Sequence, residues 1–544
     1  MNNSEPKTYN LTIYLIKEAL EKNENPINSK TVAKRINFIL GNNLEATLHL
    51  KQNSEKLPDW AKFLSQSEDI PNEWFDKNRH TGAALEVVIQ GKKLVITFGL
   101  GFSMVNGNAI ERDFGLRVAL NATDDAELRS IDKSTNSVTP LNARSQSSLG
   151  VDIDSLLIDT ESDLLFAVTG KSKVKELGSI VTGRDSLILK PKLRLEELPE
   201  ILKTVLTLYG KALPSKYRWV DNIRKIKDRK LNDQLFDQLI SQLNIDDTAN
   251  IWIGEPEIID WGNVDGFQVG SDCSRHDTIS LEKILAYLRK SQSTLSIRLL
   301  DTTTVYCKAA DGAIIKKWSV TRCIYAEILF ANETYVLRDG IWYKVDNDFI
   351  TTINRAVSKI EHYPIKFPEY DHDSEEDYNK YVETLITDAV CMDAKNISYG
   401  GGRSKIEFCD LLIKQCDFVH IKRYSGSQPL SHLFNQGYVA AETFKRSEEF
   451  RKAVNKKLPS YCQLPILEAD INVKQFSVIF AICTDKTSLP IDLPFFSKVA
   501  LKKASESLRT MGLKVYIAKI PYSATFAVNS KIKSQKNKRQ NTAR

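Results

Sequence analysis

Hydrophobic and polar positions alternate along the first part of the chain in the way typical of β-strands. The segment 82–101, GAALEVVIQGKKLVITFGLG, holds two β-prone runs on either side of the polar residues QGKK, which predicts a hairpin. The passage 132–150 is rich in Ser, Asn and Thr, and we expect a long loop there. Residues 1–195 are therefore predicted to form a β-rich α+β domain with inserted helices.

The periodicity changes after residue 195. Two runs with helical spacing, LEELPEILKTVLTLYGKAL and DRKLNDQLFDQLISQL, predict a helical segment over 196–245. Residues 246–368 read as a mixed, hairpin-rich domain. Each of the runs 304–320 and 333–349 places an Asp-Gly pair between β-prone residues, and Asp-Gly is a strong signal for a two-residue hairpin turn.

From residue 369 to 528 helical and strand patterns alternate in the order α-β-β-β-α-β-α-β. Three successive strands followed by helix-linked strands predict a mixed sheet covered by helices on both faces. The predicted elements are, in order, the helix 374–388, the strands 389–397, 405–414 and 418–425, the helix 428–444, the strand 473–483, the helix 495–511 and the strand 513–520. The chain as a whole is thus expected to be a multidomain α+β and α/β protein.

Charge and composition add little to this picture. The net charge is +6, and the tail 529–544 holds six basic residues and no acids, so the remainder is close to neutral. The tail is either a solvated, disordered end or a segment that attracts nucleic acid. We expect no membrane span and no secretion signal, and the eight scattered cysteines read as reduced thiols of a cytoplasmic protein.

Candidate chemistry gathers in the strands 405–414 and 418–425. Side chains alternate along a strand, so Asp410 would share an apolar face with Phe408, and His420 would share a face with Lys422. If these strands pair as a hairpin, Asp410 lies near both. A carboxylate, a second ligand and a lysine suit metal-assisted cleavage of a phosphodiester, in which the lysine stabilises developing negative charge.

Other interpretations of these residues stay open. Asp410 could cap a strand end or pair with Lys422, and His420 could be a hydrogen-bonded core histidine. His432 and Gln436 lie four residues apart on one helix face, where they could face the site or simply pack. Two further acids are candidate ligands. Asp393 is a reserve ligand, and Glu407 is the weaker candidate because strand alternation would turn it away from Asp410.

The order of elements and residues over about 374–523 resembles the PD-(D/E)xK nuclease superfamily of restriction enzymes and repair exonucleases. By this resemblance Asp410 matches the first acid, Lys422 the lysine, Gln436 the helix glutamine and Glu383 the upstream helical glutamate. The departure is His420, which stands where the superfamily has Glu or Asp. The resemblance implies a restriction-endonuclease-like sheet that binds DNA and cleaves it with Mg²⁺ or Mn²⁺, and an imidazole ligand favours Mn²⁺.

The runs IERDFGLRVALN, EFCDLLIK, FVHIKR and LSHLFNQGYVAAE also resemble a sporadically distributed bacterial family of about this length. That family is associated with mobile elements and defence islands, which implies a role against phage or other foreign DNA. We therefore expect a defence-associated nuclease that acts on DNA or RNA, as a homo-oligomer or with an island-encoded partner. The alternative is a non-catalytic module that senses nucleic acid or a phage protein and recruits an effector.

Overall fold

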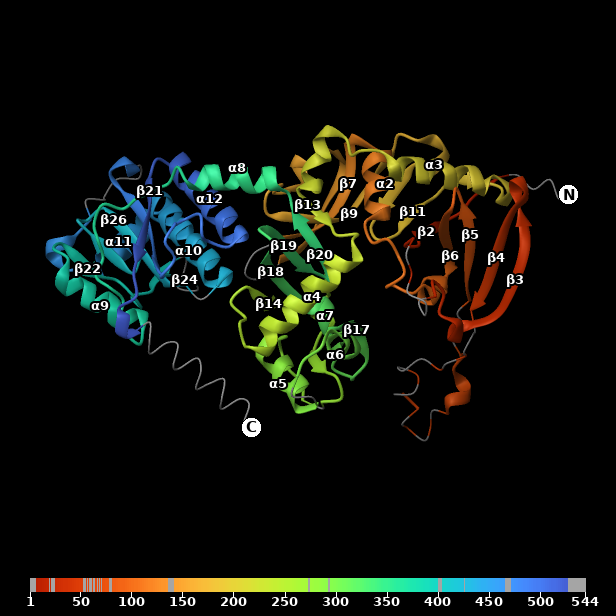
Figure 1. The fold of residues 1–544 in the computed structure, drawn as a ribbon, viewed down its shortest axis with the longest axis horizontal. Coiled ribbons are helices and arrows are strands. Elements are labelled where there is room, and N and C mark those ends of the chain that lie inside the picture. Colours follow the sequence, from red (N-terminus) through yellow and green to blue (C-terminus); the bar gives the residue numbers. More distant parts are fainter. Residues whose placement is uncertain are drawn as a thin grey trace. The chain divides into compact units, whose positions relative to one another are not determined.

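The computed structural model describes residues 6–526, apart from residues 19, 21–24, 52–54, 56, 58–60, 62–63, 66, 68, 70, 78–80, 136–140, 273, 292–293, 400–403, 425 and 465–470. The basic tail 529–544, which we expect to be disordered, lies outside the described residues. The chain divides into two compact units, residues 1–134 with 142–220 and residues 135–141 with 221–544. Each unit is described by itself (Figure 1).

A ten-stranded sheet forms the first unit. Its order is β3-β4-β5-β6-β2-β11-β10-β9-β7-β8, and neighbouring strands are antiparallel from β3 through β9. The strands are β2 (Leu11–Leu15), β3 (Val32–Leu40), β4 (Leu44–Lys51), β5 (Gly82–Ile89), β6 (Lys92–Gly99), β7 (Thr123–Thr135), β8 (Leu141–Val151), β9 (Asp163–Ser172), β10 (Ile180–Gly183) and β11 (Leu187–Leu189). A short pair, β1 (Lys7–Thr8) and β12 (Lys192–Leu193), lies apart from this sheet.

The predicted hairpin in 82–101 is confirmed. Strands β5 and β6 are joined through Gln90 and Gly91, which both adopt positive φ angles, as a type I′ turn requires. The long loop expected over 132–150 was wrong, because β7 and β8 occupy most of that passage. Strand β8 is the edge strand of the sheet, and most of its side chains are partly or fully exposed, so its sequence needs no apolar alternation.

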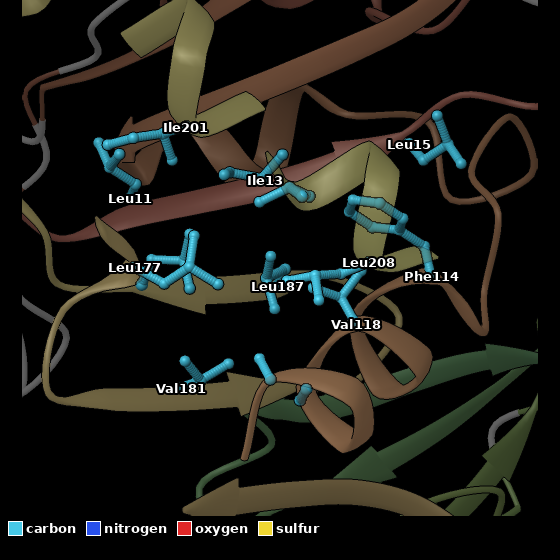
Figure 2. Packing of buried hydrophobic residues seen from close by; sticks show 14 of the residues in the cluster. Leu11, Ile13, Leu15, Phe114, Val118, Leu177, Val181, Leu187, Ile201 and Leu208 are labelled. Carbon is cyan, nitrogen blue, oxygen red and sulfur yellow. The ribbon is translucent and has the colours of Figure 1, made fainter. Parts of the chain in front are cut away.

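The core of the first unit forms where two helices pack on the sheet. Leu11, Ile13 and Leu15 alternate along β2 and are all buried, and Ile13 pairs with Leu187 of β11. Figure 2 shows these strand residues together with side chains from helices α2 (Phe114–Ala122) and α3 (Leu198–Gly210). Because alternate strand residues and one face of each helix enter the same layer, this part of the chain folds around one hydrophobic cluster.

The second unit begins with a five-stranded and a three-stranded antiparallel sheet, in the orders β13-β20-β19-β18-β14 and β15-β16-β17. Both predicted Asp-Gly hairpins are confirmed, as β16–β17 and β19–β20. The strands are β13 (Ile223–Lys225), β14 (Ile251–Ile253), β15 (Gly266–Val269), β16 (Thr304–Lys308), β17 (Ile314–Ser319), β18 (Ile324–Phe330), β19 (Glu333–Arg338) and β20 (Ile341–Val345), and the helices are α4 (Arg229–Asn244), α5 (Leu281–Ser291), α6 (Ile297–Thr302) and α7 (Val320–Cys323).

A six-stranded sheet follows in the order β21-β28-β27-β26-β25-β22. Strands β22, β25 and β26 are antiparallel neighbours, whereas β26, β27, β28 and β21 run parallel. The strands are β21 (Glu361–His362), β22 (Ala389–Cys391), β25 (Leu411–Ile413), β26 (Asp417–Arg423), β27 (Ser477–Cys483) and β28 (Lys514–Ile520), with a separate hairpin of β23 (Ile397–Tyr399) and β24 (Ser404–Ile406). The mixed sheet predicted for this region is therefore present.

Helices cover both faces of this sheet. Helices α10 (Ser427–Arg446), α11 (Glu448–Asn455) and α12 (Phe495–Thr510) pack on one face, and helix α9 (Glu375–Leu385) packs on the other. Helix α8 (Asn347–Val357) precedes the sheet and contacts α12. Among the described residues, no helix combines the length and apolar character needed to cross a bilayer.

A buried carboxylate connects the five-stranded sheet to α12. Glu327 of β18 is 8% exposed, and its two carboxylate oxygens accept the backbone N–H groups of Phe495 and Phe496. These are the first two residues of α12, whose N–H groups have no partner within the helix. The carboxylate thus caps a helix N-terminus, where negative charge is favoured.

Candidate metal centre

The position of Asp410 depends on a break between two strands. The predicted strand 405–414 is interrupted, because β24 ends at Ile406 and β25 begins at Leu411. The backbone N–H of Asp410 donates to the carbonyl of Val419 in β26, and its carbonyl accepts the N–H groups of Met392 and Asp393. Asp410 is thus fixed between the chain that leaves β22 and the middle of β26.

Three carboxylates converge at this point. One carboxylate oxygen from each of Asp393, Glu407 and Asp410 lies within 4.8 Å of the other two. The expectation that Glu407 turns away from Asp410 was wrong, because residues 407–410 are not in strand conformation and strict alternation does not apply to them. Asp393, the predicted reserve ligand, belongs to the group. We call these three residues the acid cluster.

Lys422 lies beside the acid cluster but is bound to a fourth carboxylate. Its Nζ is 2.6 Å from Oε2 of Glu375, in the first turn of α9, and the other oxygen of Glu375 accepts the backbone N–H of Arg423 at 2.9 Å. The charges of Asp410 and Glu407 also act on Lys422. The ammonium group therefore sits between Glu375 and the acid cluster.

Helix α9 contributes three polar side chains at a spacing of four residues, which places them on one face. Glu375 binds Lys422, Asn379 donates from Nδ2 to Oδ2 of Asp393 at 2.8 Å, and Glu383 accepts the backbone N–H of Cys391 at 2.9 Å. The predicted helical glutamate, Glu383, therefore supports β22 rather than the cluster. Glu375 and Asn379 were not predicted, although the row of polar residues at positions i, i+4 and i+8 could be found in the sequence.

Helix α10 reaches the cluster through one of its two predicted side chains. Gln436 Nε2 lies 3.4 Å from Oε2 of Glu407, so the helix glutamine contacts a cluster member. His432, four residues earlier, is exposed. Of the two predicted residues on this helix face, only Gln436 is thus in contact with the acid cluster.

His420 lies in the apolar layer between the sheet and α10. It is 3% exposed, its ring is 6.3 Å from that of Phe480, and a Cβ on Gly437 would come within 3.1 Å of it. Burial lowers the pKa of His420 to about 4, so the imidazole is neutral at pH 7. In the part of the chain that the structure describes, His420 is not a member of the acid cluster.

The electrostatics of the acid cluster favour a cation. Burial raises the pKa of Asp410 well above its usual range, and Glu407 and Asp393 raise it further, against the N–H of Ile421, which lowers it. Burial and the neighbouring Asp393 also raise the pKa of Glu407. Burial lowers the pKa of Lys422, but its ion pair with Glu375 and the nearby acids raise it more. Each carboxyl of the cluster is therefore harder to ionise beside the others, and a bound cation would offset that repulsion.

The donor set determines which cation would fit. All three cluster residues offer carboxylate oxygens, and oxygen ligands suit hard divalent ions such as Mg²⁺ and Mn²⁺. With His420 outside the cluster, the preference for Mn²⁺ that an imidazole ligand would bring loses its basis. The three carboxylates are thus chemically suited to either ion.

Comparison with protein families matches residues 11–521, nearly the whole chain, to a family of unknown function. No curated protein and no solved structure gave a significant match. The match is consistent with one uncharacterised family over nearly the whole chain, and it assigns no chemistry to the site.

Proposed function

The chain belongs to DUF6119, a family of unknown function, and we propose that its six-stranded sheet carries a metal-dependent nuclease that cleaves DNA. The observation that carries this proposal is the convergence of Asp393, Glu407 and Asp410 beside Lys422. Acidic ligands next to a lysine are what hydrolysis of a phosphodiester needs, because negative charge builds on the phosphoryl oxygens during the reaction.

The topology of the sheet supports the same proposal. Asp410 stands at the start of the second strand in the order β22-β25-β26-β27-β28, and Lys422 lies near the end of the third. Helix α9 precedes these strands and α10 follows the third. This is the order that underlies the resemblance to PD-(D/E)xK nucleases, with Glu407 and Asp393 supplying the acids where His420 breaks the motif.

Each residue then has a specific role. Asp393, Glu407 and Asp410 hold the cation, which when bound polarises a phosphoryl oxygen and makes its own water more acidic. Lys422 stabilises the charge that develops on the phosphate, and Glu375 positions Lys422. Gln436 orients Glu407. His420 packs α10 against the sheet and takes no part in the chemistry.

The test uses the purified full chain with supercoiled plasmid, single-stranded DNA and RNA, each with Mg²⁺, Mn²⁺ or EDTA. Wild type is expected to cleave DNA only with a divalent ion. Lys422→Ala and Asp410→Asn should each reduce the rate by at least about 100-fold. The matched control is Lys452→Ala, since Lys452 pairs with Glu448 in the same helix, α11. Cleavage that is equal in wild type and both variants, or absent with every ion, would refute the enzyme.

One observation favours the competing function, a binding module without catalysis. Lys422 is held in a 2.6 Å ion pair, and a lysine committed to a carboxylate is less available to a reacting phosphate. This alternative predicts salt-dependent DNA affinity that needs no metal and survives Asp410→Asn. A filter-binding titration in EDTA separates the two functions.

The biological setting that we propose is resistance to phage or other foreign DNA. Its support is the sequence resemblance to a family found in defence islands. Plaque counts on cells that express wild type or Asp410→Asn test it directly, with a lower count expected only for wild type.

A further inference from the structure

Asn379 presents a buried oxygen without a partner at the edge of the acid cluster. The residue lies in the middle of α9 and is 1% exposed. Its Nδ2 donates to Asp393 at 2.8 Å, whereas its Oδ1 is buried and accepts no hydrogen bond from the described residues. Buried polar atoms are nearly always paired, so an unpaired carbonyl oxygen calls for an explanation.

The orientation of the amide follows from its neighbour. Only the NH₂ group can donate to the carboxylate of Asp393, so the oxygen must take the remaining position on the same planar group. That oxygen is therefore held close to Asp393 by the hydrogen bond. The amide of Asn379 thus adds a carbonyl oxygen next to Asp393, at the edge of the acid cluster.

We propose that Asn379 completes a binding site for a hydrated divalent cation, with Oδ1 accepting a hydrogen bond from one of the waters on the ion. Mg²⁺ and Mn²⁺ take oxygen ligands, and Mg²⁺ gives up its waters reluctantly, so a site for it keeps several of them and needs acceptors around them. Asp393, Glu407 and Asp410 bind the ion, and Asn379 orients its hydration shell. This inference rests on the cation of the proposed function and not on cleavage.

Two roles of Asn379 must be separated, because its Nδ2 also orients Asp393. Asn379→Ala removes both groups. Asn379→Asp keeps an oxygen in the same place but removes the donor. If the donor alone matters, the aspartate repels Asp393 and binding falls at least as far as in the alanine variant. If the oxygen matters, Asn379→Asp restores binding.

The experiment titrates the full chain with Mn²⁺ alone and follows the loss of the free-ion EPR signal. Wild type is expected to bind Mn²⁺, Glu407→Gln to lose binding, and Asn379→Ala to weaken it by about tenfold or more. The affinity of Asn379→Asp for Mn²⁺ should be within about threefold of wild type, a smaller change than the loss expected for Asn379→Ala. Asn435→Ala, an exposed asparagine of α10, is the matched control. Circular dichroism checks that each variant is folded.

The outcomes distinguish this inference from the nuclease. If wild type and Asn379→Ala bind Mn²⁺ equally well and Glu407→Gln does not bind it, the proposed role of Asn379 is wrong. The nuclease proposal is then unaffected. An Asn379→Asp variant that binds no better than Asn379→Ala also overturns it. If binding depends on Asn379 but DNA is never cut, the nuclease fails and the cation site stands. Absence of Mn²⁺ binding in wild type overturns both.

Discussion

Glu327 is a buried carboxylate of the second unit and Asp410 is a partly buried one, and their surroundings differ. The two oxygens of Glu327 accept two backbone N–H groups at the start of α12, so its charge is offset by a helix terminus. Asp410 accepts the N–H of Ile421 but also faces Glu407 and Asp393. Burial raises the pKa of both groups. The difference indicates that a carboxylate needs a cation when other carboxylates repel it, as at Asp410, and not merely when it is buried.

The largest expected effect is on cleavage. Glu407→Gln removes a charge from the acid cluster and should lower the rate of metal-dependent cleavage about 1,000-fold, equivalent to about 4 kcal/mol in the barrier. Glu327→Gln should leave the rate within about twofold, since such a change corresponds to under about 0.5 kcal/mol. Initial rates on plasmid, measured well below the unfolding temperature, make the comparison. A similar loss in both variants would remove the distinction between the two carboxylates.

A third ionisable group, the buried His420, extends the comparison to acid pH. The pKa of His420 falls to about 4 when it is buried, from about 6.5 in the unfolded chain. The neutral imidazole therefore contributes stability that is complete above about pH 6.5 and is lost as pH falls towards 4, a change of about 3 kcal/mol. His420→Leu should remove that part of the pH dependence. Urea unfolding between pH 7.5 and 4 measures it, and an unchanged profile would contradict the assignment.

The next effect is on the stability of the cap. Glu327→Gln replaces one acceptor oxygen by an NH₂ group that faces a backbone N–H, and it removes the charge that favours the start of α12. We expect the free energy of unfolding to fall by about 2 kcal/mol. Chemical denaturation at pH 7.5 gives the value, and the exposed variant Glu376→Gln in α9 serves as the control.

The smallest effect has the opposite sign. Asp410→Asn keeps an oxygen for the N–H of Ile421 and ends the repulsion from Glu407 and Asp393, so in EDTA it should raise the free energy of unfolding by about 1 kcal/mol. Added Mn²⁺ should then stabilise wild type and not the variant. Destabilisation of the variant in EDTA would mean that the repulsion among the three carboxylates is already offset without an ion.

The sequence predicts the scaffold better than it predicts the site. The Asp-Gly hairpins follow from local signals and are observed. The helix–strand order after residue 369 is observed in outline, with the β23–β24 hairpin and helix α11 in addition. Strand β8 was missed because an edge strand with exposed side chains shows no apolar alternation. Glu407 was expected to face away from Asp410 because periodicity cannot show where a strand breaks. The break at residues 407–410 decides which side chains meet.

The roles of single residues depended on which neighbours the fold supplies. His420 was expected to bind a cation, but the sequence does not reveal that Gly437 lets α10 approach its ring closely. Glu375 and Asn379 could be seen as a polar row on α9, yet only the packing of α9 on the sheet directs that row towards Lys422 and Asp393. Glu383 lies on the same row and supports the backbone of β22 instead.

Helix α9 holds Lys422, Asp393 and the end of β22 through three side chains on one face. A single displacement of this helix would release the lysine, free the amide from Asp393 and loosen β22 at the same time. The positions of Lys422, Asp393 and β22 are therefore coupled through one short helix, without a change in any residue of the acid cluster.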